Sequence, residues 1–329
     1  MDRVVVVRQL GGIGDVLSMS CVYRGLKEKY PNKTITLITA KIYLGAALLD
    51  IAEHNPFIDE IFCYEPFEGT TENTKRVWHR EFGNSPSIDD GSDPLIRDAY
   101  EVIDLNTACV DYEWAVQPNI TKPRYQIWAE KANVWPLKDT SPAYVITEGE
   151  QEKADTYLKK YEGQTLIGVG ISAFDRKRAM GVGHLHTICH QLQERGYTPI
   201  TFDPTFTFPD VEYKIGYRIS EVMPIINRLK AMITVDSGLL HMAGAVKTPV
   251  IGLFGPTDPS MRMNTYIGSA IDSRKLMACA PCWYRYSCLS SLDENEHYKC
   301  MKRIPIDVVV EETVRWASGS HKLLQPLVP

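Results

Sequence analysis

The chain has 329 residues, 44% hydrophobic and 23% charged; this composition excludes a disordered protein, and the length suggests two domains. Its 36 Lys and Arg against 41 Asp and Glu give a net charge of −5, which disfavours a nucleic-acid binder because such a protein needs a basic surface. No apolar run approaches the ~18 residues that span a membrane, and the run at residues 4–7 is too short for a signal peptide, so we expect a cytoplasmic protein.

Short apolar runs alternate with helical patterns over the first 135 residues. We expect strands at residues 4–7, 34–39, 60–64 and 101–105, and helices at 16–26 and 42–49. This alternation predicts βαβ units and a parallel sheet. Residues 66–98 are polar and rich in Gly, Pro, Ser and Asp, which predicts a long inserted loop. Acceptor binding and a mere surface insertion explain this loop equally well.

The second half repeats the same alternation after a connector rich in Pro and Ser. Helical patterns at 123–134 and 148–161 flank the connector at 135–144, so we expect domains at 1–140 and 141–329. Further strands are expected at 165–170, 198–202, 232–235 and 249–254, with helices at 185–195, 220–229, directly after Ser237, and 306–316. The fold class is therefore α/β with two doubly wound, Rossmann-like domains, and packing back on the first domain is one option for the terminal helix.

The first chemical motif is R-Q-L-G-G-I-G-D-V-L, from Arg8 to Leu17, at the turn from the first strand into the first helix. Gly12 and Gly14 suit a tight turn whose N–H groups approach another group closely. The third glycine of a dinucleotide fingerprint is missing, and Asp15 would repel a pyrophosphate, so the loop is a poor NAD site. Asp15 is either an N-cap or a carboxylate that accepts a proton; from this segment alone the cap is the simpler interpretation.

The second motif runs from Asp236 to Pro259 and contains strand, turn, short helix, strand and turn. Ser237 and Gly238 open the helix, where free N–H groups hold phosphate. His241 lies one helical turn further on, and it is either a ligand-facing group or a packing histidine. The turn Gly255, Pro256, Thr257 and Asp258 follows the next strand at the same sheet edge, where ligands bind in open α/β sheets; ordinary turn chemistry also accounts for it.

Both motifs resemble the signatures of glycosyltransferase family 9, the bacterial heptosyltransferases that use ADP-heptose, and the resemblance spans nearly the whole chain. It implies the GT-B architecture, in which two Rossmann-like domains face each other across a cleft. It also implies inverting transfer of a sugar, with heptose expected, from a nucleotide-diphosphate sugar on the second domain to an acceptor on the first. The acceptor hydroxyl belongs to lipopolysaccharide, protein or another glycan.

The resemblance also implies roles for single residues. Asp15 occupies the general-base position, and Glu221 that of a nucleotide-contacting glutamate, although a carboxylate in a first helical turn also favours the helix dipole. Ser172 lies in the diphosphate loop with Lys177 or Arg178 as its cation, in place of a catalytic divalent metal. Here the chain reads Lys-Arg-Ala-Met where the family often has Lys-Trp-Pro, so either cation fits. Gly244 replaces a common alanine, which we interpret as a packing difference.

Four of the eight cysteines fall between residues 279 and 300, in the pattern C-x2-C-x5-C-x11-C. Such a set in a cytoplasmic protein suits a structural metal finger with zinc or iron; free thiols are the alternative. The resemblance includes family members with similar clusters that heptosylate proteins, for which iron is implied. The expected ligands are Cys279, Cys282, Cys288 and Cys300. The scattered cysteines are expected to be core thiols: Cys21, Cys63, Cys109 and Cys189.

Two other functions compete with sugar transfer. One is a nucleotide-binding oxidoreductase, which the incomplete glycine fingerprint disfavours. The other is a non-catalytic GT-B scaffold built around the metal finger. For a lipid-linked acceptor, peripheral attachment to the inner membrane is compatible with the cytoplasmic prediction, as is a homo-oligomer.

Overall fold

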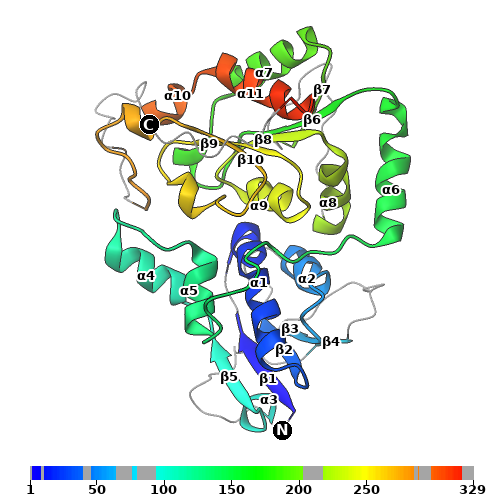
Figure 1. Ribbon diagram of the computed structural model, residues 1–329, viewed down its shortest axis with the longest axis vertical. Helices are drawn as coiled ribbons and strands as arrows, with labels where there is room; N and C mark the ends of the chain where they lie inside the picture. Colours follow the sequence, from blue (N-terminus) through cyan, green and yellow to red (C-terminus); the bar gives the residue numbers. More distant parts are fainter. Residues whose placement is uncertain are drawn as a thin grey trace. The chain divides into compact units, whose positions relative to one another are not determined.

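The computed structural model describes residues 2–8, 11–39, 46–63, 76–79, 94–202, 218–284, 288 and 298–320 (Figure 1). The chain divides into two compact units. The first comprises Met1–Ile146 with Tyr217–Ser220, and the second Thr147–Gly216 with Glu221–Pro329. The predicted domain boundary at residue 140 lies in the connector shortly before this division.

The first unit is built on a parallel sheet with the strand order β4-β3-β2-β1-β5. Its strands are β1 (Arg3–Val7), β2 (Thr34–Thr39), β3 (Glu60–Cys63), β4 (Arg76–His79) and β5 (Glu101–Asp104). β1 pairs with β2 on one side, Val5 opposite Thr36, and with β5 on the other, Val5 opposite Val102. The winding therefore reverses beside β1, and its carboxyl end is the place where such sheets bind ligands.

Helices cover the first sheet on both faces. They are α1 (Ile13–Lys29), α2 (Ala46–Glu53), α3 (Pro94–Arg97), α4 (Ala108–Val116) and α5 (Arg124–Lys131). Val4 and Val6 pack in one core cluster with residues of α1 and α5, whereas Val5 and Val7 pack with residues of α3 on the other side. Burial on both faces explains why β1 is a continuous apolar run, as the sequence predicted.

The second unit repeats this plan with the strand order β10-β9-β8-β6-β7, again all parallel. The strands are β6 (Leu166–Gly170), β7 (Thr198–Thr201), β8 (Ala231–Val235), β9 (Val250–Phe254) and β10 (Gly268–Asp272). The helices are α6 (Glu148–Leu158), α7 (Val182–Glu194), α8 (Ile219–Arg228), α9 (Gly238–Ala245), α10 (Lys299–Lys302) and α11 (Ile306–Ala317). In Figure 1, α7 and α11 cover one face of this sheet, while α8 and α9 cover the other. The terminal helix α11 packs on α7 and β8 of its own unit.

The structure corrects the sequence prediction at four elements. Residues 66–98 are not one unbroken loop, since β4 and α3 lie within them; the rest of that segment lies outside the described residues. β4 and β10 are edge strands of four and five residues, and β10 is only half-buried, so neither shows an apolar run. α4 contains β-branched and aromatic residues with little periodicity, and was missed for that reason.

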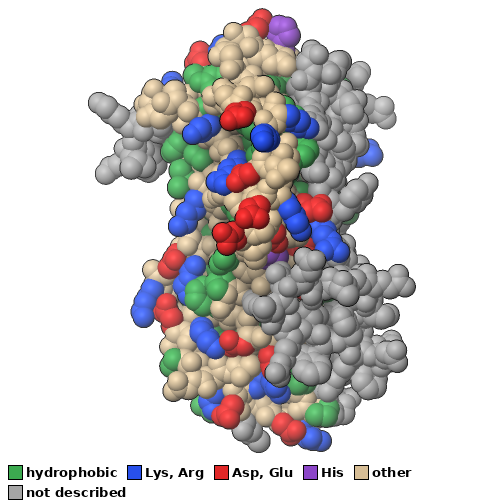
Figure 2. All heavy atoms as spheres, turned by 90° about the vertical axis from the view of Figure 1, so that its right-hand side faces the viewer, with side chains coloured by type: hydrophobic (Ala, Val, Ile, Leu, Met, Phe, Trp, Pro, Cys, Tyr) green, Lys and Arg blue, Asp and Glu red, His purple; other side chains and the backbone are tan. Residues whose placement is uncertain are grey.

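The surface carries both signs of charge. On the face drawn in Figure 2, Lys and Arg side chains are interspersed with Asp and Glu side chains among the described residues. Local pairs, rather than a uniform field, therefore dominate the electrostatics on this face. Within the part of the chain that the structure describes, no helix combines the length and the apolar character needed to cross a membrane.

Candidate functional site

Asp15 lies in the first turn of α1, directly beyond the carboxyl end of β1. Gly12 is the N-cap residue, and its backbone N–H donates to Oδ2 of Asp15 at 3.0 Å. The predicted N-cap role of Asp15 is therefore wrong, because Gly12 is the N-cap residue. Asp15 is the third residue of the helix, and its side chain accepts from the N-cap backbone as the acidic member of a capping box. Gly14 lies beside it in the same turn of α1. The Asp15 side chain is 22% exposed, so its carboxylate remains accessible.

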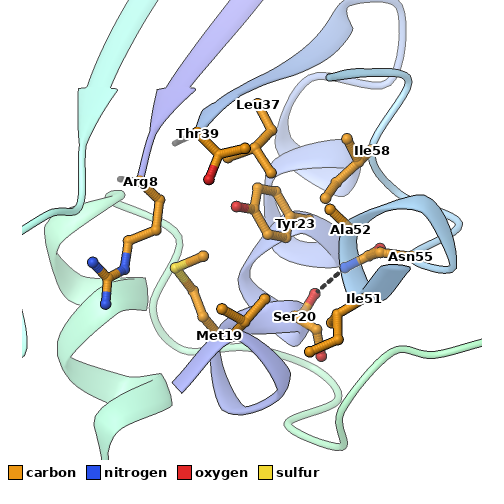
Figure 3. A pocket seen from close by; sticks show the side chains of 11 residues that line it. Arg8, Met19, Ser20, Tyr23, Leu37, Thr39, Ile51, Ala52, Asn55 and Ile58 are labelled. Atoms are coloured by element: carbon orange, nitrogen blue, oxygen red, sulfur yellow. Dashed lines mark hydrogen bonds between the residues drawn. The ribbon is translucent and has the colours of Figure 1, made fainter. Parts of the chain in front are cut away.

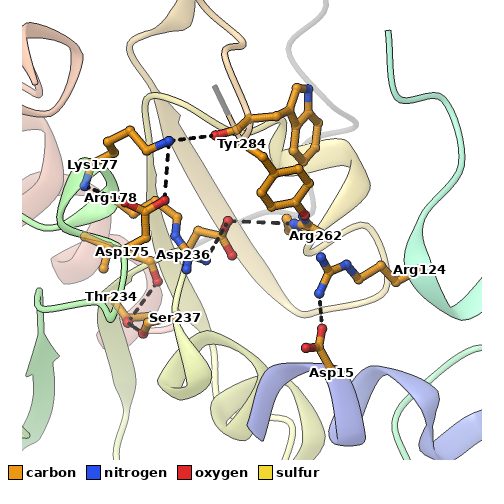
Figure 4. A network of polar contacts seen from close by, with 12 residues as sticks. Asp15, Arg124, Asp175, Lys177, Arg178, Thr234, Asp236, Ser237, Arg262 and Tyr284 are labelled. Carbon is orange, nitrogen blue, oxygen red and sulfur yellow. Dashed lines mark hydrogen bonds and ion pairs between the residues drawn. The ribbon is translucent and has the colours of Figure 1, made fainter. Parts of the chain in front are cut away.

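A partly buried ion-pair network holds Asp15 from the other side, and Figure 4 shows its contact between Asp15 and Arg124. Nη1 of Arg124 donates to Oδ1 of Asp15. Nε and Nη2 of Arg124 donate to the two carboxylate oxygens of Glu113, at 2.9 and 2.6 Å. The Glu113 side chain is only 1% exposed, which makes its pairing with Arg124 obligatory. Sequence reasoning missed both partners because each is a single charged residue on a remote helix, without a motif.

Arg8 brings a second cation to the same strand end. Its side chain is buried, donates from Nη1 to the carbonyl of Asn106 at 3.2 Å, and lies 5.6 Å from the Trp128 ring centre. Burial lowers the pKa of Arg8, and the negative charge of Asp15 opposes this shift. A Cβ at Gly11 would lie 2.8 Å from Nη2 of Arg8, so only glycine lets the turn approach the guanidinium so closely.

A pocket lies in the first unit beside Arg8, between α1, α2 and β2 (Figure 3). It contains about 390 Å³ of empty space, part of it open to solvent, with mostly apolar walls such as Met19. Two buried polar atoms of its lining, Nε of Arg8 and the hydroxyl of Tyr23, have no hydrogen-bond partner among the described residues. Burial also raises the pKa of Tyr23, so its hydroxyl stays protonated and able to donate.

In the second unit, two arginines approach one buried carboxylate, that of Asp236, just after β8 (Figure 4). Oδ2 of Asp236 lies 3.4 Å from Nη1 of Arg178 and 3.7 Å from Nε of Arg262. Burial acts to raise the pKa of Asp236, but the two guanidinium groups overcome it and hold the pKa below its usual value. An ionised carboxylate facing two cations leaves a net positive charge at the carboxyl ends of β6 and β8, where this sheet reverses its winding.

The two predicted cations of the loop after β6 have different surroundings. Nζ of Lys177 donates to the carbonyl of Trp283 at 3.3 Å and lies 3.6 Å from a carboxylate oxygen of Asp175. Arg178 points to Asp236 instead, and its buried Nε has no hydrogen-bond partner among the described residues. An unpartnered buried donor on a cation is typical of a site that a polar ligand completes. Ser172, predicted in the same loop, is half-buried.

Arg262 is a site residue that the sequence analysis missed. Its side chain is 7% exposed, lies 5.0 Å from the centre of the Trp283 ring, and donates from Nη2 to the hydroxyl of Tyr284 at 2.9 Å. These contacts hold the guanidinium beside Asp236. No signal in the sequence marks it, because Arg262 lies beyond the end of the second motif, directly after a short 3-10 turn (Pro259–Met261).

The amino end of α9 completes this strand edge. Ser237 is its N-cap residue and Gly238 its first residue, as predicted. His241 is buried in α9, and its Nδ1 lies 2.6 Å from the hydroxyl of Tyr266, which supports the packing interpretation. A Cβ at Gly244 would lie 2.5 Å from the Tyr266 ring. Glycine at this position thus admits the tyrosine that contacts His241.

The residues of the turn after β9 make hydrogen bonds and an ion pair with neighbouring segments of the second unit. The carbonyl of Pro256 accepts hydrogen bonds from the backbone N–H groups of Cys282 and Trp283, both at 3.0 Å. Asp258 caps the following 3-10 turn through Ser260 and pairs with Arg274 at 2.5 Å. Gly255 faces Cys300, whose Sγ would lie 2.8 Å from an added Cβ. Thr257 is buried near Asp236, whereas Glu221 is exposed in the first turn of α8.

The predicted metal finger is not formed among the described residues, where no three His, Cys, Asp or Glu side chains lie close enough to hold one ion. Burial raises the pKa of Cys300 to about 11, and the charges of Cys279, Cys282 and Cys288 add to this shift. The four thiols are thus within electrostatic reach of one another without converging. The core-thiol prediction is confirmed for three scattered cysteines, while the side chain of the fourth, Cys63, lies outside the described residues: Cys21, Cys109 and Cys189 are buried.

Comparison with known proteins finds relatives among the heptosyltransferases. Residues 216–296 match the family model of glycosyltransferase family 9 (heptosyltransferase). The chain is 29% identical over 296 residues to lipooligosaccharide heptosyltransferase 2 of Haemophilus influenzae, covering 75% of this chain and 82% of that protein.

Solved structures share the fold over almost the whole chain. A family 9 glycosyltransferase from Veillonella parvula superposes with a TM-score of 0.66 at 15% identity, covering 97% of both chains. The iron-containing dodecameric glycosyltransferase TibC of enterotoxigenic E. coli superposes with a TM-score of 0.60 at 11% identity, covering 98% of this chain and 80% of that one. The predicted α/β fold of two Rossmann-like units is confirmed, and the oxidoreductase alternative is not supported. The chain is a glycosyltransferase that resembles the heptosyltransferases of family 9.

Proposed function

We propose that the protein transfers heptose, with inversion, from an ADP-heptose-like donor to a hydroxyl of a lipopolysaccharide core. The observation that carries this proposal is the cation pair on Asp236, at the strand edge where the second sheet reverses its winding. Arg178 and Arg262 share one carboxylate, so positive charge is left over for a diphosphate beside the amino end of α9. The relationship to a lipooligosaccharide heptosyltransferase supports the sugar and the acceptor class.

The donor side of the proposed reaction has to stabilise a leaving diphosphate. As the bond between the anomeric carbon and the diphosphate oxygen breaks, negative charge develops on that oxygen. Arg178, through its unpartnered Nε, and the free N–H groups at Gly238 are the donors that we expect to face it. Such a set of fixed cations and dipoles does the work that a divalent metal does elsewhere.

Asp15 is the proposed general base on the acceptor side. Its carboxylate takes the proton of the acceptor hydroxyl while that oxygen forms its bond to the anomeric carbon from the face opposite the diphosphate. Asp15 is accessible, and the cations Arg8 and Arg124 lie beside it. It is the only one of the predicted site residues for which the sequence suggested this role.

A donor screen with product detection tests the proposal. ADP-heptose, ADP-glucose, UDP- and GDP-sugars are offered with a heptose-deficient lipopolysaccharide core as acceptor, and transfer from ADP-heptose alone is expected. Asp15→Asn should abolish transfer but leave ADP binding intact. Transfer by Asp15→Asn at the wild-type rate would remove the base assignment, and transfer only to a protein or to another glycan would change the acceptor.

A structural iron or zinc at the four cysteines is a second proposal. Its support is the thiol spacing and the iron in the name of TibC, which shares the fold. The described sulfur positions do not converge, so metal binding would have to draw the thiols together. Elemental analysis of protein purified without chelator should find one metal per chain in the wild type and none in Cys279→Ser/Cys282→Ser. Absence of metal from both refutes the site.

Location and assembly are also proposals. We expect a cytoplasmic protein that attaches peripherally to the inner membrane when the acceptor is lipid-linked, and a homo-oligomer is in line with the dodecameric TibC. Cell fractionation with and without a salt wash checks the first, and light scattering on the purified protein checks the second.

A further inference from the structure

We infer that Glu113 is a positioning residue that keeps Asp15 competent as a base by restraining Arg124; the inference rests on the proposed function of Asp15. The three side chains come from three helices: Asp15 from α1, Glu113 from α4 and Arg124 from α5. α5 packs against both α1 and α4, so the packing of the first unit places Arg124 between the other two side chains.

The geometry of the guanidinium is the first argument. Arg124 presents its N–H groups as a rigid planar fork. Glu113 occupies one complete edge of this fork, because its two oxygens accept from Nε at 2.9 Å and from Nη2 at 2.6 Å. Of the N–H groups outside this edge, the one that contacts Asp15 is on Nη1, and it reaches Oδ1. Arg124 therefore contacts Asp15 through one nitrogen rather than through a two-fold, bidentate contact.

A single-pronged contact matters for the reaction. Oδ2 of Asp15 accepts from the N–H of Gly12 at 3.0 Å, and each carboxylate oxygen has about two lone-pair sites. Each of these two contacts uses one lone-pair site, so neither of them by itself closes its oxygen to the proton of an acceptor hydroxyl. If Glu113 were absent, Arg124 could turn and bind both oxygens of Asp15, as arginines commonly do with carboxylates. The acceptor would then have to compete with the guanidinium.

Charge is the second argument, and it acts in the same direction. A neighbouring cation lowers the pKa of a carboxylate and so weakens it as a base. The buried negative charge of Glu113 offsets that of Arg124. Among the described residues, Arg8, directly after β1, and Cys109, from α4, also act on Asp15; burial raises the pKa of Cys109, which stays neutral. Arg8 therefore acts on Asp15 as a cation, whereas the positive charge of Arg124 is compensated by the negative charge of Glu113.

The test is the pH dependence of kcat. Its lower limb reports the ionisation of the base, since only the carboxylate form reacts. In Glu113→Gln we expect this limb to move to lower pH by about half to one unit, and kcat at its plateau to fall about tenfold. In Arg124→Gln the limb should move to higher pH. In the double variant, Glu113→Gln should add no downward shift, because Glu113 acts through Arg124.

Glu130→Gln is the matched control. Glu130 is also a glutamate ion-paired in this unit, with Lys122 at 2.7 Å, but it has no contact to Asp15 among those described here. Its pH profile should equal that of the wild type. If Glu113→Gln lowers the melting temperature and the active fraction but leaves the limb in place, Glu113 is merely structural and the inference is refuted. If that variant does not fold, an unmoved or downward-shifted limb in Arg124→Gln refutes it instead.

A second readout separates this inference from the proposed function. The pKa of Asp15 is measured by NMR on carboxyl-labelled aspartate, with Asp15→Asn used for assignment. Glu113→Gln should lower this pKa whether or not Asp15 is the base. Retained turnover in Asp15→Asn would refute the proposed function alone, whereas an unchanged Asp15 pKa in Glu113→Gln would refute the role of Glu113.

Discussion

Arg178 and Arg262 contact the same carboxylate, yet their replacement should have different consequences. Replacing Arg262 should lower stability, whereas replacing Arg178 should weaken donor binding. The Arg262 side chain is 7% exposed and that of Asp236 is 4% exposed, so Arg262→Gln leaves a buried charge with a weakened set of partners. Breaking a buried pair costs about 3 kcal/mol, and the lost contacts to Trp283 and Tyr284 add to this. For a unit of this size we expect the melting temperature to fall by about 6–12 °C.

Arg178→Gln removes a side chain that is 27% exposed and that retains an unpartnered donor. The stability cost should be below about 1 kcal/mol, since solvent screens this pair more strongly. The donor should instead bind more weakly, with ADP affinity reduced about tenfold or more through the loss of a charge-assisted hydrogen bond.

Differential scanning calorimetry and isothermal titration with ADP measure the two effects on the same samples. A comparable loss of stability in both variants would contradict the different burial of the two arginines. Unchanged ADP affinity in Arg178→Gln would contradict the assignment of the Asp236 edge as the diphosphate site.

Two further perturbations test the surroundings of this edge. Gly244→Ala places a methyl group 2.5 Å from the Tyr266 ring, so it should lower stability by about 1–3 kcal/mol in urea unfolding, whereas Gly149→Ala, with no atom within 4 Å, should not destabilise. The pKa of Asp236 is depressed in the folded state, so its ion pairs stabilise the protein above the ordinary aspartate pKa, and this contribution is lost as the pH falls through the lower folded value. The melting temperature should therefore decline as the pH drops below 3.8, and less steeply in Asp236→Asn; parallel curves would argue against an ionised Asp236.

The amino-acid sequence by itself determined the interior strands and the residues placed beside them. The strand Thr34–Thr39 was predicted with its observed bounds, and so was the start of α9 after Ser237. Both follow from local physics: strands buried on two faces are continuous apolar runs, and a residue of the Ser type before a helix caps it. Asp15 and Asp236 could be found for the same reason, since Asp236 directly follows such a strand and Asp15 lies in the first turn of the helix after one.

Only the tertiary structure decided which charges stand next to these carboxylates. Arg124 is 109 positions from Asp15, and Arg262 is 26 positions beyond Asp236 in an irregular segment. A lone arginine on a helix or turn has no pattern that distinguishes it from a solvated one. The pairing arises because helix packing brings α1, α4 and α5 together, and because burial makes an unpaired charge too costly to leave. The ionisation of each carboxylate is thus a property of the packed units rather than of the motif that contains it.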